Sequence, residues 1–73
     1  MMNENHNFNF VYTVIPDDND ELYSVCCLDE KGIKIKVIDA IGKKDTTEKF
    51  CNFLNEGKIH PYHFEDIYED YFG

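Results

Sequence analysis

The fold is decided by residues 8–42, which read FNFVYTVIPDDNDELYSVCCLDEKGIKIKVIDAIG. Three runs rich in β-branched and aromatic residues (8–15, 22–28 and 33–41) are separated by two short polar connections. Runs of this composition between turn residues are typical of strands. Connections this short join antiparallel neighbours. The stretch therefore predicts a three-stranded antiparallel meander.

The third run has the clearest alternation in the chain. Apolar and basic side chains follow one another in the order Ile33, Lys34, Ile35, Lys36 and Val37. Because successive side chains of a strand point to opposite faces of the sheet, we expect the three apolar side chains to be buried and the two lysines to face water. Gly32, just before this run, suits a turn position with positive φ.

The residues after the meander predict a first helix over 45–56. Asp45 and Glu48 have the spacing of a capping box, in which each side chain satisfies a free backbone amide at the helix start. Gly57 suits the left-handed position that often follows a helix end. The apolar side chains of this helix form one stripe, made of Phe50, Cys51, Phe53 and Leu54.

A second helix is predicted to begin at Pro61, because a helix has no use for the first-turn amide proton that proline lacks. Its apolar residues follow the i, i+3, i+4, i+7, i+8 spacing of an amphipathic helix: Phe64, Ile67, Tyr68, Tyr71 and Phe72. The order β-β-β-α-α predicts a single small α+β domain over residues 1–73, with residues 1–7 loose. We expect both helices to pack on one face of the sheet.

Charge is distributed unevenly along the chain. The net charge is −8, and all seven basic residues are lysines that lie between Lys31 and Lys58. An acidic protein repels nucleic acids and anionic membranes, so we expect neither as a direct partner. A protein with a basic surface remains compatible, although acidic charge also serves solubility alone.

The second helix carries an acidic face formed by Glu65, Asp66, Glu69 and Asp70. Glu65 and Glu69, like Asp66 and Asp70, are like-charge pairs at i, i+4, which destabilise a helix by a few tenths of a kcal/mol. No lysine lies nearby in the sequence. Either lysines of the third strand reach across to these acids, or the acids serve a partner, or they form an ordinary solvated face.

Tyrosines interleave with these acids, and tyrosine is enriched at protein interfaces. We therefore predict that Tyr62 and Tyr68 join the acidic face as a contact surface. The connection between the first two strands adds a second acidic patch, formed by Asp17, Asp18, Asp20 and Glu21. This connection lacks the glycine and the distal glutamate of an EF-hand loop, so we predict a turn and no calcium site.

Cysteine and histidine are the remaining candidates for chemistry. Cys26, Cys27 and Cys51 are an odd number, and no secretory signal segment precedes them, so we expect reduced thiols in a cytoplasmic protein. His60 and His63 are expected to serve the start of the second helix. A redox or metal sensor that uses the Cys26–Cys27 pair or the two histidines is a further hypothesis. No catalytic or phosphate-binding motif is present, and we predict neither enzyme activity nor a cofactor.

The C-terminal segment resembles a family of small uncharacterised proteins from clostridia and related Firmicutes. That family ends in a Pro-x-His-Leu-x-Asp-(Ile/Val)-x-x-Asp pattern, and the matching positions here are Pro61, His63, Phe64, Asp66, Ile67 and Asp70. Phe64 stands where the family usually has leucine. The resemblance covers most of the chain after Tyr12 and implies the same fold and a similar host. It implies no activity.

At the level of class, the chain is similar to small acidic phage-encoded inhibitors such as anti-CRISPR proteins, which present acidic surfaces to basic nucleic-acid grooves. Our leading functional hypothesis is therefore a small acidic protein-binding module that inhibits or regulates a basic-surfaced partner, such as a nucleic-acid enzyme. The alternative is a bacterial housekeeping or sporulation-associated protein that works as a homodimer.

Overall fold

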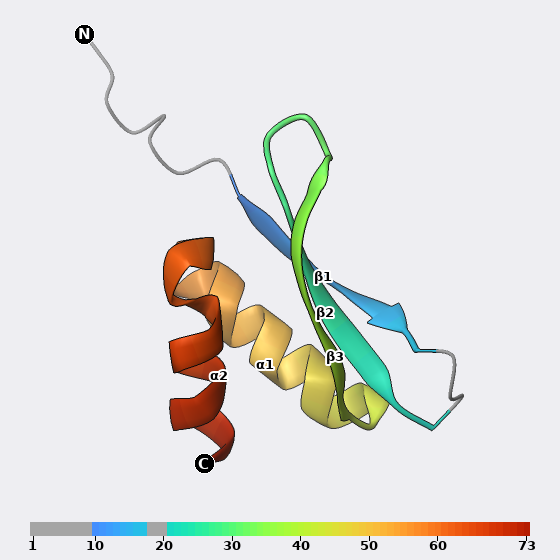
Figure 1. Cartoon of the computed structure of the whole chain (residues 1–73). Coiled ribbons are helices and arrows are strands. Elements are labelled where there is room, and N and C mark those ends of the chain that lie inside the picture. The colour runs from blue at the N-terminus through green and yellow to red at the C-terminus, as the bar shows by residue number, and fades with distance from the viewer. Residues whose placement is uncertain (1–9, 18–20) are drawn as a thin grey trace, which may run out of the picture.

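The chain forms three strands followed by two helices (Figure 1). The computed structural model describes residues 10–17 and 21–73, so the segment predicted to be loose and Phe8 lie outside the described residues. The strands are β1 (Val11–Pro16), β2 (Tyr23–Leu28) and β3 (Lys34–Gly42). They are followed by α1 (Lys44–Glu56), the short 3-10 helix η2 (Pro61–His63) and α2 (Phe64–Phe72). The predicted α+β order β-β-β-α-α is confirmed.

The sheet is the predicted antiparallel meander, with strand order β1-β2-β3. Asp29 organises the turn between β2 and β3, because its carboxylate oxygen Oδ1 accepts hydrogen bonds from the backbone amides of Lys31 (2.8 Å) and Ile33 (2.9 Å). Gly32 has a φ of 81° in this turn, as predicted. Glycine adopts this conformation without the steric cost that a side chain would add.

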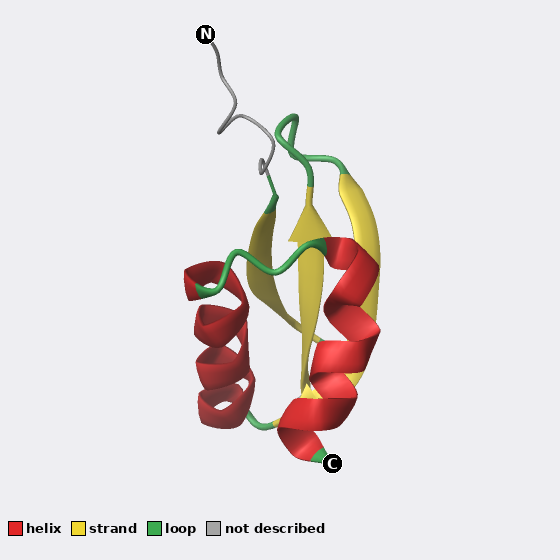
Figure 2. Ribbon diagram, turned by 90° about the vertical axis from the view of Figure 1, so that its left-hand side faces the viewer, coloured by secondary structure: helices red, strands yellow, loops and turns green. Residues whose placement is uncertain are grey.

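Both helices cover the same face of the sheet (Figure 2). The core lies between these two layers and is built from buried side chains of every major element except β3: Tyr12, Val25, Cys27, Phe50, Cys51, Leu54 and Phe64. Burial of this apolar area is the main favourable contribution to folding.

Asn55 of α1 fastens the helix to the edge of the sheet. Its side-chain amide donates to the carbonyl oxygen of Tyr12 (2.9 Å), and its Oδ1 accepts from the amide of Tyr12 (2.9 Å). The hydroxyl of Tyr12 in turn donates to the carbonyl oxygen of Ile59 (2.6 Å). Through Tyr12, β1 is therefore bonded both to the last turn of α1, at Asn55, and to the segment that follows α1, at Ile59.

The predicted orientation of β3 is wrong. Lys36 pairs with Cys27, which belongs to the core on the helix-covered face, whereas Val37 pairs with Cys26 on the opposite face. Lys36 is half-buried, while Ile33 and Ile35 are 56% and 44% exposed. The pairing register decides which face each side chain takes, and alternation within one strand does not reveal that register.

Two irregularities in the β2–β3 pairing help to set this register. Near the end of β3, Ala40 has a φ of 53°, and Ser24 fills the irregular segment. The Ser24 hydroxyl oxygen accepts from the amide of Ala40 (3.2 Å), and the hydroxyl donates to Oδ1 of Asp39 (3.4 Å). Beyond this point Ile41 packs against the core.

The ends of α1 differ from both predicted caps. The helix begins one residue earlier than predicted, so Asp45 lies in its first turn, and the N-cap residue Lys43 makes no side-chain capping bond. At the other end Gly57 has a φ of −82°, and Lys58 takes the left-handed position with a φ of 51°. The amides of Lys58 and Ile59 donate to Asn55 and Leu54 in the pattern of a Schellman motif.

Both helices are short, with 13 residues in α1 and 9 in α2. A bilayer-crossing helix needs about 20 apolar residues, and none of the helices in the described ranges reaches the required length and apolarity.

Candidate protein-binding surface

His60 and Pro61 begin η2, the 3-10 turn that leads into α2. The ring nitrogen Nδ1 of His60 accepts a hydrogen bond from the amide of Tyr62 (3.0 Å), so the proton of the neutral ring is on Nε2. Pro61 occupies the first turn and is buried. The segment predicted as one helix from Pro61 is the 3-10 helix η2 followed by α2 from Phe64. His60 serves the start of η2, whereas His63, the N-cap residue of α2, makes no side-chain capping bond. Within η2 the Tyr62 side chain is 82% exposed.

Phe64 anchors α2 in the core. It is fully buried, and its ring lies 5.0 Å from that of Tyr12 and 6.4 Å from that of Phe50. Ile67 and Tyr68 are half-buried one turn later. The apolar stripe continues to the C-terminus, but Tyr71 and Phe72 are 42% and 39% exposed. The second helix is therefore anchored at its start and presents aromatic rings to solvent at its end.

The four carboxylates predicted as a contact surface are all exposed along α2: Glu65, Asp66, Glu69 and Asp70. We call this set the acidic face. Over residues 10–17 and 21–73 the structure pairs none of them with a lysine or histidine nitrogen within 4 Å. The lysines of β3 therefore do not neutralise the acidic face, which was one of the alternatives that the sequence left open.

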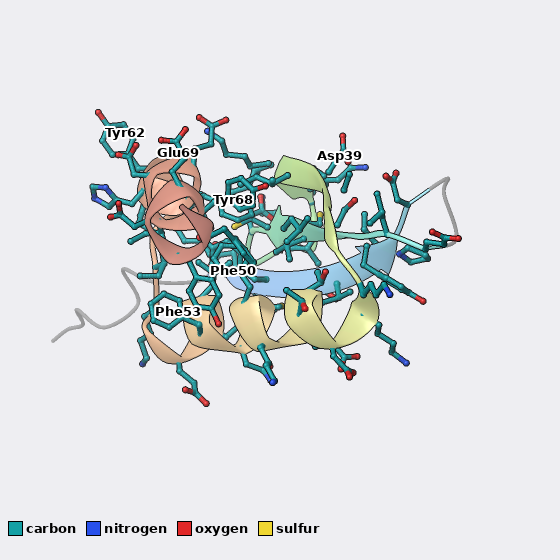
Figure 3. The ribbon with its side chains drawn as sticks, turned by 90° about the horizontal axis from the view of Figure 1, so that it is seen from below. Asp39, Phe50, Phe53, Tyr62, Tyr68 and Glu69 are labelled. Atoms are coloured by element: carbon teal, nitrogen blue, oxygen red, sulfur yellow. The ribbon has the colours of Figure 1, made fainter. Side chains whose placement is uncertain are left out.

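The two predicted tyrosines lie differently. Tyr62 projects outward, as does Glu69, whereas Tyr68 lies on the side of α2 that faces the sheet (Figure 3). The ring of Tyr68 is 5.9 Å from Phe50 and 5.3 Å from Phe72. Tyr62 is thus fully available to a partner, and Tyr68 contributes mainly to packing at the edge of the core.

An open pocket of about 280 Å³ lies between the helices and is lined by Phe53, Ile67, Asp70 and Tyr71. The rings of Phe53 and Tyr71 are 5.2 Å apart, and Phe53 is 44% exposed. The sequence predicted Phe53 within the apolar stripe of α1 and gave no sign that it would be exposed. The missing information is the position of α2, which covers Phe50 and leaves one side of Phe53 open.

The second predicted acidic patch lies only partly within the described residues. Asp18 and Asp20 lie outside the described residues, while Asp17 and Glu21 flank the connection between β1 and β2. The amide of Asp17 donates to the carbonyl of Leu22 (3.1 Å), which closes the connection as predicted. The end of β1 and the start of β2 lie on the far side of the sheet from α2 (Figure 1).

The three thiols are free and buried. Cys27 faces the helices, and Cys26 faces the other side of the sheet, where Thr13 and Val37 flank it. Burial raises the pKa of all three, and for Cys51 burial and the charge of Glu48 raise the pKa to about 11. Thiols with raised pKa values are protonated near neutral pH and are poor nucleophiles.

Metal-binding side chains do not gather in the described part of the chain, where no cluster of three or more histidine, cysteine or acidic residues has the arrangement of a metal site. The Nδ1 atom of His60, which could have served as a ligand, is occupied by the backbone. The exposed surface of α2 is thus the strongest candidate for function.

Comparisons of the chain with protein families, with curated proteins and with solved structures give no match.

Proposed function

We propose that this protein is a small binding module whose acidic face inhibits or regulates a partner with a basic surface. The observation that carries the proposal is the acidic face itself: four exposed carboxylates on one short helix, without a basic partner among the described residues, next to the exposed rings of Tyr62 and Tyr71. Aromatic residues at the centre of a charged rim are typical of protein interfaces.

The physical argument concerns the cost of this arrangement. Like charges at i, i+4 destabilise α2, and the acids near its C-terminal end, Glu69 and Asp70, oppose the helix dipole. A basic partner would convert this repulsion into attraction and would speed association through long-range steering. A nucleic-acid enzyme has such a surface, and an acidic module that occupies it would compete with the nucleic acid, as an anti-CRISPR protein does.

The test is a pull-down with tagged protein from the lysate of a low-GC Gram-positive bacterium that carries a CRISPR system, washed at low and at high salt. The test variant neutralises the acidic face (E65Q/D66N/E69Q/D70N). The matched control neutralises four exposed acids elsewhere (E30Q/D45N/E48Q/E56Q), so that both variants have a net charge of −8 + 4 = −4.

The proposal predicts that wild type and control retain the same nucleic-acid enzyme, that high salt releases it, and that the test variant misses it. Purified enzyme should then lose activity when wild-type protein is added. Equal recovery by wild type and both variants, or no recovery by any of them, would contradict the proposal.

A second candidate, a homodimer, is favoured by exposed apolar side chains on the face of the sheet opposite the helices. On this face the cross-strand pairs include Val11 with Leu28 and Thr13 with Cys26, which also pairs with Val37. Val11 is 55% exposed, as is Ile33 at 56% near the start of β3. Sedimentation over a range of concentrations distinguishes the two functions. A dimer that dissociates on Val11→Lys would support this candidate, and a monomer at all concentrations would exclude it.

A further inference from the structure

We propose that the pocket between α1 and α2 binds an arginine side chain of the partner. This inference rests on the proposed function, because it names the group on the partner's basic surface that the module binds. The occupant would lay its alkyl stem on Ile67, place its guanidinium against the adjoining rings of Phe53 and Tyr71, and pair with the carboxylate of Asp70.

The size of the pocket restricts its occupant. Pockets for small organic ligands span roughly 300–1,000 Å³, and this pocket of about 280 Å³ lies just below that range. Its openness to solvent suits a side chain that enters from another protein and remains attached to its own backbone. A single long side chain is therefore compatible with the size and openness of this pocket.

The lining restricts the chemistry of the occupant. Three of the four lining side chains are apolar or aromatic, and the fourth is a carboxylate. An anionic group would be repelled by Asp70, and a purely apolar group would cover part of that carboxylate without a partner for it. Arginine satisfies both parts, because its stem is apolar and its planar cation stacks on aromatic rings and pairs with carboxylates.

The charge around the pocket also favours a cationic occupant. Asp66 lies one helical turn before Asp70, on the same edge of α2. Neither carboxylate is paired with a basic side chain in the described residues. The pocket thus opens at the edge of the acidic face, where the local potential attracts a cation before contact.

Tyr71, one of the two aromatic walls, packs against other rings of the domain before any partner arrives. Tyr71 contacts Phe50 (5.0 Å between ring centroids) and Phe72 (4.9 Å), and Phe50 is fully buried. Phe53 projects from α1 beneath α2 (Figure 3). These contacts reduce the conformational entropy that the Tyr71 side chain loses on binding.

The test is an NMR titration of the ¹⁵N-labelled full chain with a blocked pentapeptide, Gly-Lys-Arg-Lys-Gly. Two matched peptides replace its arginine with lysine or with the neutral isostere citrulline. We expect saturable shifts at Phe53, Ile67, Asp70 and Tyr71 with the arginine peptide, and affinity about 3- to 30-fold lower for the citrulline peptide. Phe53→Ala and Asp70→Asn should each weaken the arginine peptide to a similar degree.

Ile35→Ala is the matched control, because Ile35 is as exposed as Phe53 (44% each) and lies in β3, outside the pocket. It should leave the affinity unchanged, and the amide spectra of all variants report whether they are folded. Equal affinity for the arginine and citrulline peptides, or for wild type and Phe53→Ala, would overturn the inference. So would equal affinity for the lysine peptide.

The pull-down separates this inference from the proposed function. If Phe53→Ala retains the partner as well as wild type does and the neutralised acidic face does not, the pocket inference fails and the proposed function stands. If wild type retains no basic partner, the proposed function fails, and the peptide titration still decides whether the pocket selects arginine.

Discussion

The two helices of this domain are built on the same amphipathic pattern and have different uses. Helix α1 buries four side chains, Thr47, Phe50, Cys51 and Leu54, whereas α2 buries only Phe64. The exposed charged residues of α1 are lysines and acids together, and those of α2 are all acids. The comparison teaches that α1 stabilises the fold and that α2, anchored at one end, displays a charged and aromatic surface.

Phe50 joins the two helices. Its ring contacts Phe64, Tyr68, Tyr71 and Phe72, so it supports all four aromatic residues of α2 from the side of α1. A domain of this size is marginally stable, and a single contact of this kind is a large fraction of its stability.

The largest expected effect is therefore at Phe50. Phe50→Ala should lower the free energy of unfolding by about 3–5 kcal/mol, because it removes a fully buried ring and leaves a cavity. Phe72→Ala, on the exposed part of α2, should cost less than about 1 kcal/mol. Urea unfolding followed by circular dichroism measures both. If the two variants lose similar amounts of unfolding free energy, the claim that α1 stabilises the fold while the end of α2 displays a surface is wrong.

The next effect concerns the attachment of α1 to the sheet. Asn55→Ala removes two hydrogen bonds to the backbone of Tyr12 and should cost about 1–3 kcal/mol. Asn52→Ala, at an exposed position of the same helix, is the matched control and should change stability by less than about 0.5 kcal/mol. If thermal melts show the same change for both, the attachment does not contribute to stability.

A smaller, stabilising effect is expected at the end of α1. Lys58 holds a left-handed conformation that costs a non-glycine residue about 1 kcal/mol, so Lys58→Gly should raise the free energy of unfolding by about that amount. Lys49→Gly, in the helix interior, should lower it by a similar amount. The sign of the change in urea midpoint checks the prediction, and a loss of stability in Lys58→Gly would contradict it.

The smallest expected effect tests the difference in charge between the exposed surfaces of α1 and α2. Glu69→Gln should stabilise the domain by a few tenths of a kcal/mol, because it relieves repulsion with Glu65 and removes an acid near the C-terminal end of α2. Asp45→Asn, in the first turn of α1, should destabilise it by a similar amount, because an acid there is favourable. Melting temperatures at low salt should move in opposite directions, and high salt should reduce both changes.

The order of elements could be predicted from the sequence because it depends on local signals. The polar connections, Gly32 and Pro61 mark where elements begin and end, and the apolar spacing identifies their type. The orientation of β3 could not be predicted, because it depends on irregular pairing with β2 around residues such as Ala40. The left-handed residue at the end of α1 was misplaced by one position, since Gly57 is the more usual candidate than Lys58.

The candidate surface was only partly predictable. The acidic face follows from helical spacing alone, and the structure places all four acids in solvent. The pocket depends on how α2 crosses α1, which no pattern within either helix encodes, so Phe53 was expected inside the core. The attachment made by Asn55 is equally hidden, because it joins residues 43 positions apart.

The most direct test of the central claim is a titration of the purified partner with wild type, with the acidic-face variant E65Q/D66N/E69Q/D70N and with the control E30Q/D45N/E48Q/E56Q, over a range of salt concentrations. The account predicts tight binding by wild type that weakens steeply with salt, nearly the same behaviour in the control, and a large loss of both affinity and salt dependence in the acidic-face variant. Equal loss in the two variants would show that net charge alone drives binding and would contradict a specific role for α2.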